Sequence, residues 1–446
     1  MFRTLVYSHQ LFFNMKKSYI LTCILIFICF NLFGQNLKGG GEKYPDLTTN
    51  ETSLKNWQTL RFGMFVHWGP VSLKGTEIGW SRGNPVPFEE YDNLYKQFNP
   101  EKFDAAEWVG LMKEAGMKYL VFVSKHHDGF VMWDTETTDY NIMSTPYAKD
   151  VLMDLSKECE KQGILFGTYY SICDWRHPDY PVEHNNPQRR EEANMENYIK
   201  YMKAQLKELV ENYHTKILWF DGEWEEPWTH EMGMDLYKYV RGLDDEILIN
   251  NRVDKGRQGM EGISLSDKFA GDFATPEQQV GRFDLLTPWE SCITICRQWA
   301  WKPDDKMKSK EECLHTLLRT VGGDGNLLFN VGPMPDGRIE ERQADRLREM
   351  GTWLEKYGVS IYATSGGPVS PQEWGVSTSA KNKIYLHVLE PVKEITLPEV
   401  PGEISSIHSM NDGSDISYNL EGKDIKITLP KIKKNVIDYV VEINLR

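Results

Sequence analysis

The segment 217–224 reads ILWFDGEW, and it is the most informative stretch of the chain. An apolar run suited to a buried strand ends here in Asp221, a glycine, a glutamate and a tryptophan. In a barrel of alternating strands and helices, the carboxyl ends of the strands face the active site. Asp-Gly is also a common turn pair, so a plain turn or helix N-cap aspartate is the alternative. The rest of the chain has to decide between these two interpretations.

Strands and helices alternate on both sides of this segment, over residues 53–363. Expected strands cover 62–68, 118–124, 164–171, 216–220, 247–250 and 325–331, and expected helices cover 105–115, 151–162, 197–213 and 340–357. This alternation is typical of α/β proteins with a parallel sheet and right-handed crossovers. About 300 residues of it predict a (β/α)8-like catalytic barrel. An open doubly wound sheet is the alternative, but no GxGxxG motif follows the first strand.

The pattern changes after residue 363. Short expected strands cover 383–389, 393–397, 404–410, 424–429 and 436–445, and no helical stretch lies among them. Short strands separated by turns predict an all-β sandwich domain over residues 364–446. We expect this domain to pack against the barrel and stabilise it, with carbohydrate binding as the alternative role.

The first 34 residues are predicted to be a signal peptide. Lys16 and Lys17 precede an apolar run over 19–33, which ends at Gly34, and Met15 is the expected true start. The run is short for a membrane-spanning helix, so no membrane anchor is expected. Residues 35–52 are polar and glycine-rich and are predicted to be a linker. These features predict export to the periplasm of a Gram-negative bacterium.

Composition excludes some function classes. The net charge is −14 at pH 7, which argues against a nucleic-acid partner because such partners are usually bound by a basic face. Five of the seven cysteines lie outside the signal peptide, and no CxxC pair occurs, so neither a disulfide framework nor a structural zinc site is expected. Aromatic residues make up 12% of the chain, which weakly supports a carbohydrate site.

Polar side chains lie at or just after the ends of five successive expected strands. One histidine at a strand end is more often a hydrogen-bonded core residue than a ligand. Several polar groups in corresponding positions instead indicate one common site at the mouth of the barrel. These groups are His67, His126 with His127, Tyr169, Asp221, and Asn251 with Arg252.

A metal centre is one chemistry that these residues suggest. His67, His126, His127, Asp128 and Asp221 are all of ligand type. However, no HxH or HExxH motif is present, and adjacent histidines on a strand point to opposite faces. We therefore expect no metal and no cofactor.

Glycoside hydrolysis is the other chemistry, and it requires two carboxyl groups beside one bond. Asp221 is the candidate nucleophile or base. The protonated acid, whose pKa must be raised, is expected on a later strand-end loop. Glu277 and Glu290 are the leading candidates, and spacing does not choose between them.

Taken together, these motifs resemble those of glycoside hydrolase family 29, the α-L-fucosidases. The resemblance covers about residues 55–365, and its motifs occur in the family's order. The paired histidines and the GNLLFNVGP run are highly specific when found together. The motifs are 62–69 (FGMFVHWG), 125–130 (KHHDGF), 169–171 (YYS), 219–222 (WFDG), 251–252 (NR), 275–277 (TPE) and 325–333 (GNLLFNVGP).

The resemblance implies an exo-acting, retaining enzyme that releases terminal L-fucose from fucosylated glycans or oligosaccharides. It implies Asp221 as the nucleophile that forms a covalent fucosyl-enzyme and Glu277 as the acid/base. Glu290 then supports the site from behind. The sugar-binding residues implied by position are His67, His126, His127, Tyr169, Arg252 and Trp299.

One element departs from the family pattern. The family often has Glu-Trp-Tyr after the first strand, whereas this chain has EIGWSR at 77–82. We expect Trp80 to take the place of the family's tryptophan, and Glu77 is the candidate for its glutamate. Two other functions remain open: a retaining glycosidase for another galacto-configured or deoxy sugar, and an inactive sugar-binding barrel. The presence of both carboxyl groups argues against the second.

Overall fold

The computed structural model describes residues 50–446 except 184, 265–268 and 399. The predicted signal peptide and the predicted linker up to residue 49 lie outside the described residues. Helix α2 (Glu51–Leu60) begins with Asn50 as its N-cap, so the last two residues of the predicted linker are helical. Within the described part of the chain, no helix is both long enough and apolar enough to cross a membrane.

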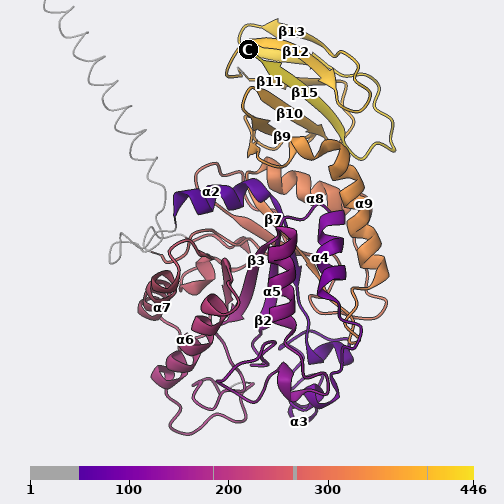
Figure 1. Cartoon of the computed structure of the whole chain (residues 1–446). Helices are drawn as coiled ribbons and strands as arrows, with labels where there is room; N and C mark the ends of the chain where they lie inside the picture. The colour runs from indigo at the N-terminus through magenta and orange to yellow at the C-terminus, as the bar shows by residue number, and fades with distance from the viewer. Residues whose placement is uncertain (1–49, 184, 265–268, 399) are drawn as a thin grey trace, which may run out of the picture. The chain divides into compact units, whose positions relative to one another are not determined.

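A parallel sheet of seven strands forms the centre of the larger domain, in the order β5-β4-β3-β2-β1-β7-β6. Figure 1 shows helices α4, α5, α6 and α7 on the outside of this sheet. This arrangement confirms the predicted α/β fold with a barrel-like parallel sheet. The strands are β1 (Phe62–Val66), β2 (Tyr119–Lys125), β3 (Leu165–Ser171), β4 (Ile217–Asp221), β5 (Leu248–Ile249), β6 (Glu290–Thr294) and β7 (Asn326–Val331).

An irregular segment takes the place of an eighth strand between β5 and β6. Residues 273–277 make isolated parallel bridges from Phe273 to Asn250, from Ala274 to Trp289 and from Glu277 to Cys292. Pro276 lies within this segment and has no N–H to donate to a regular ladder. The bridges close the gap in the sheet and carry Glu277 to the barrel mouth.

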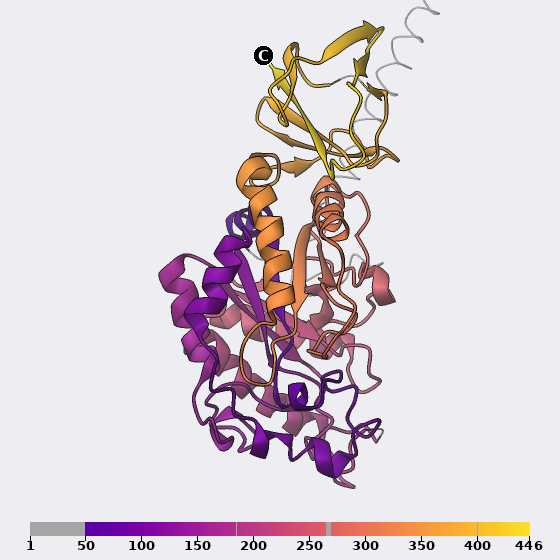
Figure 2. The same ribbon diagram turned by 90° about the vertical axis from the view of Figure 1, so that its right-hand side faces the viewer.

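The helices cover the outer face of the sheet (Figures 1 and 2). Local sequence explains several of their ends. In α5, the Asp150 side chain accepts from the N–H of Met153, and Gly163 ends the helix in the left-handed conformation. In α8, Ser309 and Glu312 form a capping box. The helices after α2 are α3 (Phe88–Tyr91), α4 (Ala105–Glu114), α5 (Val151–Gln162), α6 (Met195–Glu211), α7 (His230–Leu243), α8 (Lys310–Gly322) and α9 (Glu341–Tyr357).

Within the larger domain, strand β6 and helices α2, α3, α7 and α8 were not among the predicted elements. Helix α7 contains Gly233 and Gly242, which weaken intrinsic helix preference. A Cβ added to Gly233 would lie 2.8 Å from the Val253 carbonyl oxygen, so glycine allows α7 to pack closely on the segment that follows β5. That segment is the 3-10 turn η4 (Asn251–Val253), which carries Arg252. Tertiary packing, rather than propensity, therefore places α7.

The C-terminal domain contains two antiparallel sheets, in the orders β12-β15-β10-β9-β8 and β11-β14-β13. Both sheets contribute to one apolar core, which includes Leu386 of β10 and Ile427 of β14, so the domain is a sandwich. His315 of α8 contacts the Ile437 carbonyl oxygen at 2.8 Å. The strands are β8 (Ser365–Gly366), β9 (Gly375–Ala380), β10 (Lys383–Val388), β11 (Glu394–Leu397), β12 (Ile404–Ser409), β13 (Ser417–Glu421), β14 (Asp424–Thr428) and β15 (Tyr439–Leu445).

Candidate active site

A cavity of about 330 Å³ lies at the carboxyl ends of the parallel strands. Parallel strands end at the same edge of a sheet, so side chains just after them meet there. The cavity wall includes His67 after β1, His126 after β2, Tyr169 of β3, Asp221 of β4 and Arg252 of η4. Five successive strand ends therefore contribute to one site.

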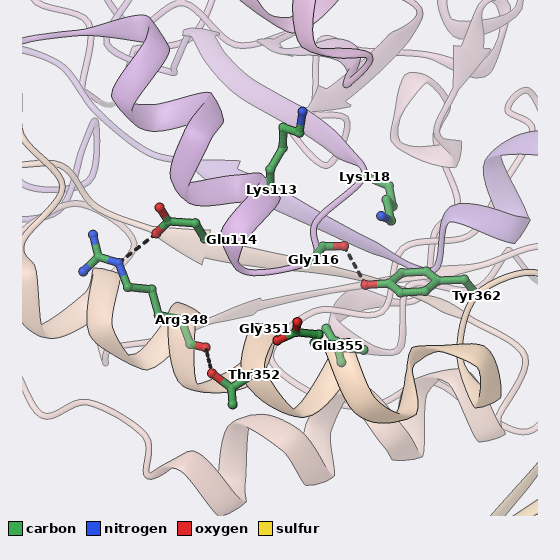
Figure 3. A pocket seen from close by; sticks show the side chains of 10 residues that line it. Lys113, Glu114, Gly116, Lys118, Arg348, Gly351, Thr352, Glu355 and Tyr362 are labelled. Atoms are coloured by element: carbon green, nitrogen blue, oxygen red, sulfur yellow. Dashed lines mark hydrogen bonds and ion pairs between the residues drawn. The ribbon is translucent and has the colours of Figure 1, made fainter.

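A larger hollow of about 600 Å³ lies between α4 and α9, away from the strand ends (Figure 3). Its carboxylate Glu114 pairs with Arg348 at 2.9 Å, and these side chains are 58% and 43% exposed. The Tyr362 hydroxyl donates to the Gly116 carbonyl oxygen at 2.6 Å. Exposed ion pairs of this kind are weak and leave their groups in an ordinary aqueous environment. We therefore place the chemistry in the smaller cavity.

Asp221 is the last residue of β4, and its backbone is turned by the glycine that follows. Gly222 has φ +99°, and a Cβ there would lie 2.5 Å from Cys173 Sγ. The Asp221 carboxylate accepts from Arg252 Nη1 at 2.7 Å and from the Tyr169 hydroxyl at 3.0 Å. Burial alone would raise the Asp221 pKa, but the charge and the hydrogen bond of Arg252 outweigh it and hold the pKa below its usual range. The carboxylate is therefore ionised and available as a nucleophile.

Arg252 joins the two candidate catalytic carboxyl groups. Its Nη1 donates to Asp221 Oδ1 at 2.7 Å, and its Nη2 donates to Glu277 Oε2 at 2.8 Å. Its Nε donates to Thr275 Oγ1 at 3.0 Å, and the guanidinium lies 4.4 Å from the centre of the Trp219 ring. A planar guanidinium fixed by so many partners holds both carboxyl groups in a defined geometry.

Glu277 lies on the segment that bridges β5 and β6. Its backbone N–H donates to the Met260 carbonyl oxygen at 2.9 Å, which fixes the main chain. Its side chain is 20% exposed, compared with 12% for Asp221 and 2% for Arg252. Glu277 is thus the more solvent-accessible of the two carboxyl groups, as a residue that must exchange protons with a leaving group and with water requires.

The histidines of the site are neutral at pH 7. Burial, the largest cause, lowers the pKa of His67 to about 3 and that of His127 to about 4, and it lowers the pKa of His126 as well. His67 Nδ1 lies 2.6 Å from Asn330 Oδ1, and Asn330 Nδ2 donates to the Trp299 carbonyl oxygen, which fixes the amide orientation. His67 Nδ1 therefore carries the hydrogen, and its Nε2 can accept from a ligand. In the part of the chain that the structure describes, no group of three His, Cys, Asp or Glu side chains is arranged to hold a metal ion.

Comparison with known proteins identifies the family. The sequence profile described as Alpha-L-fucosidase matches residues 41–359, which is most of the chain. The chain belongs to the α-L-fucosidase family. It is 28% identical to an α-L-fucosidase of Branchiostoma floridae over 373 residues, covering 76% of this chain and 80% of the relative. It is 27% identical to the human tissue α-L-fucosidase over 411 residues, covering 84% and 85%.

Solved α-L-fucosidase structures share the fold. Isoenzyme 1 from Paenibacillus thiaminolyticus has a TM-score of 0.79 and 31% identity, with 89% of this chain and 99% of that chain covered. A family 29 enzyme from Bacteroides thetaiotaomicron, trapped as a covalent intermediate with 2-fluoro-fucosyl fluoride, has a TM-score of 0.79 and 27% identity, with 89% and 97% covered. These comparisons confirm the resemblance inferred from the sequence motifs.

Most of the residues expected in this fucosidase site line the cavity, whereas His127, Glu77 and Glu290 do not. His67, Trp80, His126, Tyr169, Asp221, Arg252, Glu277 and Trp299 all line it. His127 lies just behind the wall, with Nε2 3.7 Å from Asp221 Oδ2 and its ring edge-on to Trp80 and to Trp224. Its contacts support the nucleophile and the aromatic rim.

Glu77 is the second expected residue that does not line the cavity. Its carboxylate accepts from the backbone N–H of Trp299 at 3.0 Å and from that of Ala300 at 3.3 Å. It therefore ties the loop that carries Trp80 to the loop that carries Trp299, and both tryptophans belong to the cavity wall. The geometry gives Glu77 a role in holding the wall rather than a contact with a ligand.

Replacing Glu77 with alanine is expected to raise KM for a fucoside by about tenfold with little change in kcat. The loss of two charge-assisted hydrogen bonds, each worth about 1.5–3 kcal/mol, lets the Trp299 loop move. Steady-state kinetics measure the effect. Glu89→Ala is the control, because Glu89 is a carboxylate of nearby α3 that caps no such loop. A KM unchanged within twofold in Glu77→Ala would contradict the assigned role.

Several residues of the site were not singled out from the sequence. Asn330 orients His67, and Thr275 accepts from Arg252, yet the motifs that contain them served only as marks of the family resemblance. A polar side chain inside the buried run 326–331 was the available signal for Asn330, because a buried amide needs a specific partner. No local signal indicated that Arg257 Nε pairs with the buried Glu223 at 2.7 Å.

Proposed function

We propose that this chain is an exo-acting, retaining α-L-fucosidase that releases terminal L-fucose from glycans. The observation that carries this proposal is the pair of carboxyl groups held by adjacent nitrogens of Arg252 in a cavity lined by neutral imidazoles and tryptophan. Carboxyl groups that share one guanidinium lie close together. Retention requires a separation of about 5–5.5 Å and inversion one of about 6.5–9.5 Å. The covalent intermediate trapped in the Bacteroides thetaiotaomicron enzyme supports retention.

In the first step, the ionised Asp221 attacks the anomeric carbon while Glu277 gives its proton to the departing glycosidic oxygen. The bond to the leaving group breaks as the bond from Asp221 Oδ forms, which gives a covalent fucosyl ester. In the second step, Glu277 takes a proton from water, the water oxygen attacks the same carbon, and fucose leaves with Asp221 restored. Asp221 also stabilises the positive charge that develops on the sugar ring.

The cavity wall suits the sugar. Fucose has three free ring hydroxyls and a methyl group. His67 Nε2 accepts from one hydroxyl, and Tyr169 and Arg252 are fixed on Asp221 beside the reacting carbon. Trp299 lies against His67 and Phe65, with ring centres 4.8 and 5.9 Å away, and we place the methyl group on this apolar face.

A pair of substrates tests whether the sugar carbon beside Trp299 carries a methyl group, as in fucose. 4-Nitrophenyl α-L-galactoside differs from the α-L-fucoside by one hydroxyl on the methyl carbon. An unpaired buried hydroxyl costs about 1–3 kcal/mol, so kcat/KM for the fucoside is expected to be about 10–100-fold higher. The ratio is measured with purified residues 35–446. Equal or faster turnover of the galactoside would overturn the fucose assignment and favour another galacto-configured substrate.

We also propose that the chain is exported to the periplasm. The support is the Lys16-Lys17 pair followed by the apolar run over 19–33. Cell fractionation of a Gram-negative host expressing the full chain tests this proposal. Full-length protein found only in the cytoplasm would contradict it.

A further inference from the structure

Glu290 is a carboxyl group inside the barrel, below the floor of the active site. It is the first residue of β6, and none of its surface is exposed. Trp219 Nε1 donates to its Oε1 at 3.0 Å, and the Tyr119 hydroxyl donates to its Oε2 at 2.5 Å. Barrel interiors are normally filled by branched apolar side chains, and a buried carboxyl group costs stability unless it is well bonded. Its presence here needs an explanation.

The Trp219 indole connects Glu290 to the catalytic groups. One edge of the ring is fixed by Glu290, and the ring itself lines the cavity. The Arg252 guanidinium lies 4.4 Å from the ring centre, and the Tyr169 ring stacks on it at 5.7 Å and 20°. Arg252 and Tyr169 both donate to Asp221. A shift of the indole would therefore displace the nucleophile's partners together.

We propose that Glu290 is a positioning residue for the reaction: it fixes the Trp219 indole, and through Arg252 it sets the placement of Asp221 and Glu277. This inference rests on the proposed fucosidase activity. Glu290 is not a second proton donor, because it does not line the cavity and has no exposed surface. A donor must reach the glycosidic oxygen within about 3 Å.

The pKa of Glu290 is set by its burial and by its two hydrogen bonds, which act in opposite directions. Burial, the largest cause, raises the pKa of Glu290 to about 7. The groups that face it are Tyr119 from β2, Trp219 from β4 and Cys292 from its own strand, with Arg252 on the far side of the indole. Burial also raises the pKa values of Tyr119 and Cys292 well above their usual range, so neither ionises near pH 7. Glu290 is thus the group beneath the floor that changes charge in that range.

Two variants separate positioning from simple packing. In Glu290→Gln, the amide oxygen still accepts from Trp219, and the NH2 group can donate to Tyr119, so kcat/KM is expected to stay within about fivefold of the original. In Glu290→Leu, the indole loses its anchor, and kcat is expected to fall by about 100-fold with KM little changed, because small misplacements cost about 10²-fold. The loss should be equal for good and poor leaving groups, unlike the loss of an acid catalyst. A loss in Glu290→Gln as large as in Glu290→Leu would overturn the proposal.

Tyr119→Phe is the matched control, because it removes the hydrogen bond to the other oxygen of the same carboxyl group. It is expected to lower the melting temperature but to leave kcat/KM within about threefold. A double-mutant cycle then tests whether Glu290 acts on the catalytic groups through the Trp219 indole. Trp219→Phe lacks the Nε1 donor. Adding Glu290→Leu to this variant is therefore expected to lower kcat by less than about a further fivefold. Additive losses in the cycle would contradict the proposed route.

A measurement without turnover keeps this inference separate from the proposed function. The unfolded chain releases the Glu290 proton near pH 4.5, whereas the folded chain keeps it up to about pH 7. The original protein should therefore lose stability relative to Glu290→Gln as the pH rises from about 4.5 to 7. Binding of a fucose-configured iminocyclitol, measured by calorimetry, should weaken in Glu290→Leu by about tenfold or more. If the original protein turns over no fucoside, the proposed function fails. If the stability difference from Glu290→Gln does not change with pH and Glu290→Leu binds the iminocyclitol as tightly as the original protein does, the Glu290 proposal fails.

Discussion

Replacing Asp221 with glycine is expected to lower turnover of 4-nitrophenyl α-L-fucoside by about 10⁴-fold or more. The substitution removes the carboxylate proposed to form the covalent intermediate, and the loss of a catalytic nucleophile costs several orders of magnitude. Arg252 keeps its bond to Glu277, so the remaining site should still bind the sugar. Added azide can occupy the vacated position and attack from the same side, which gives β-L-fucosyl azide. Steady-state kinetics and product NMR measure both effects.

Asp272→Ala is the matched control for this variant. Asp272 is also a carboxylate paired with an arginine, since Arg241 Nη2 donates to it at 2.8 Å, but it does not line the cavity. It is expected to lower the melting temperature, because breaking a buried pair costs about 3–5 kcal/mol, with much smaller effects on kcat. Activity of Asp221→Gly within about tenfold of the original would remove Asp221 from the nucleophile role.

Replacing Glu277 with alanine is expected to have the second largest effect, and the effect should depend on the leaving group. General acid catalysis contributes about 10²–10⁴-fold, and only poor leaving groups need it in the first step. Fucosylated disaccharides should therefore lose about 10³-fold in kcat/KM, whereas a dinitrophenyl fucoside should lose about tenfold or less. Azide attacks the fucosyl-enzyme in this variant and gives α-L-fucosyl azide, the opposite anomer from that of Asp221→Gly.

Glu261→Ala serves as the control for Glu277. Glu261 is a carboxylate of the neighbouring loop, but its side chain is 56% exposed and it pairs with Arg282. It should leave kcat/KM within about twofold for both kinds of substrate. Equal losses on good and poor leaving groups in Glu277→Ala would point to another acid.

The sequence allowed the barrel and its mouth to be predicted, because both depend on local pattern. Buried strands are continuous apolar runs, and a polar residue that ends such a run is visible without a structure. The expected strand at 216–220 differs from β4 by one residue at each end, and the side chains after five strands do meet in one cavity. The fold class and the family are confirmed, whereas the catalytic roles of Asp221 and Glu277 stay predictions.

What the sequence did not yield depends on contacts between distant segments. Glu77 and Trp299 are 222 residues apart, and no local pattern shows that this carboxylate accepts from that loop. The segment 273–277 replaces a regular strand through isolated bridges, which have no periodicity to detect. Glu290 was suggested both as an alternative acid and as a supporting residue. Its complete burial, visible only in the structure, favours the supporting role.

The most direct test of the proposed mechanism is the anomer of fucose formed first. Proton NMR during hydrolysis of 4-nitrophenyl α-L-fucoside by residues 35–446 shows which anomer appears before mutarotation equilibrates the two. Double displacement through Asp221 predicts α-L-fucose as the first product. If β-L-fucose appears first, the enzyme inverts, and a covalent intermediate on Asp221 is contradicted.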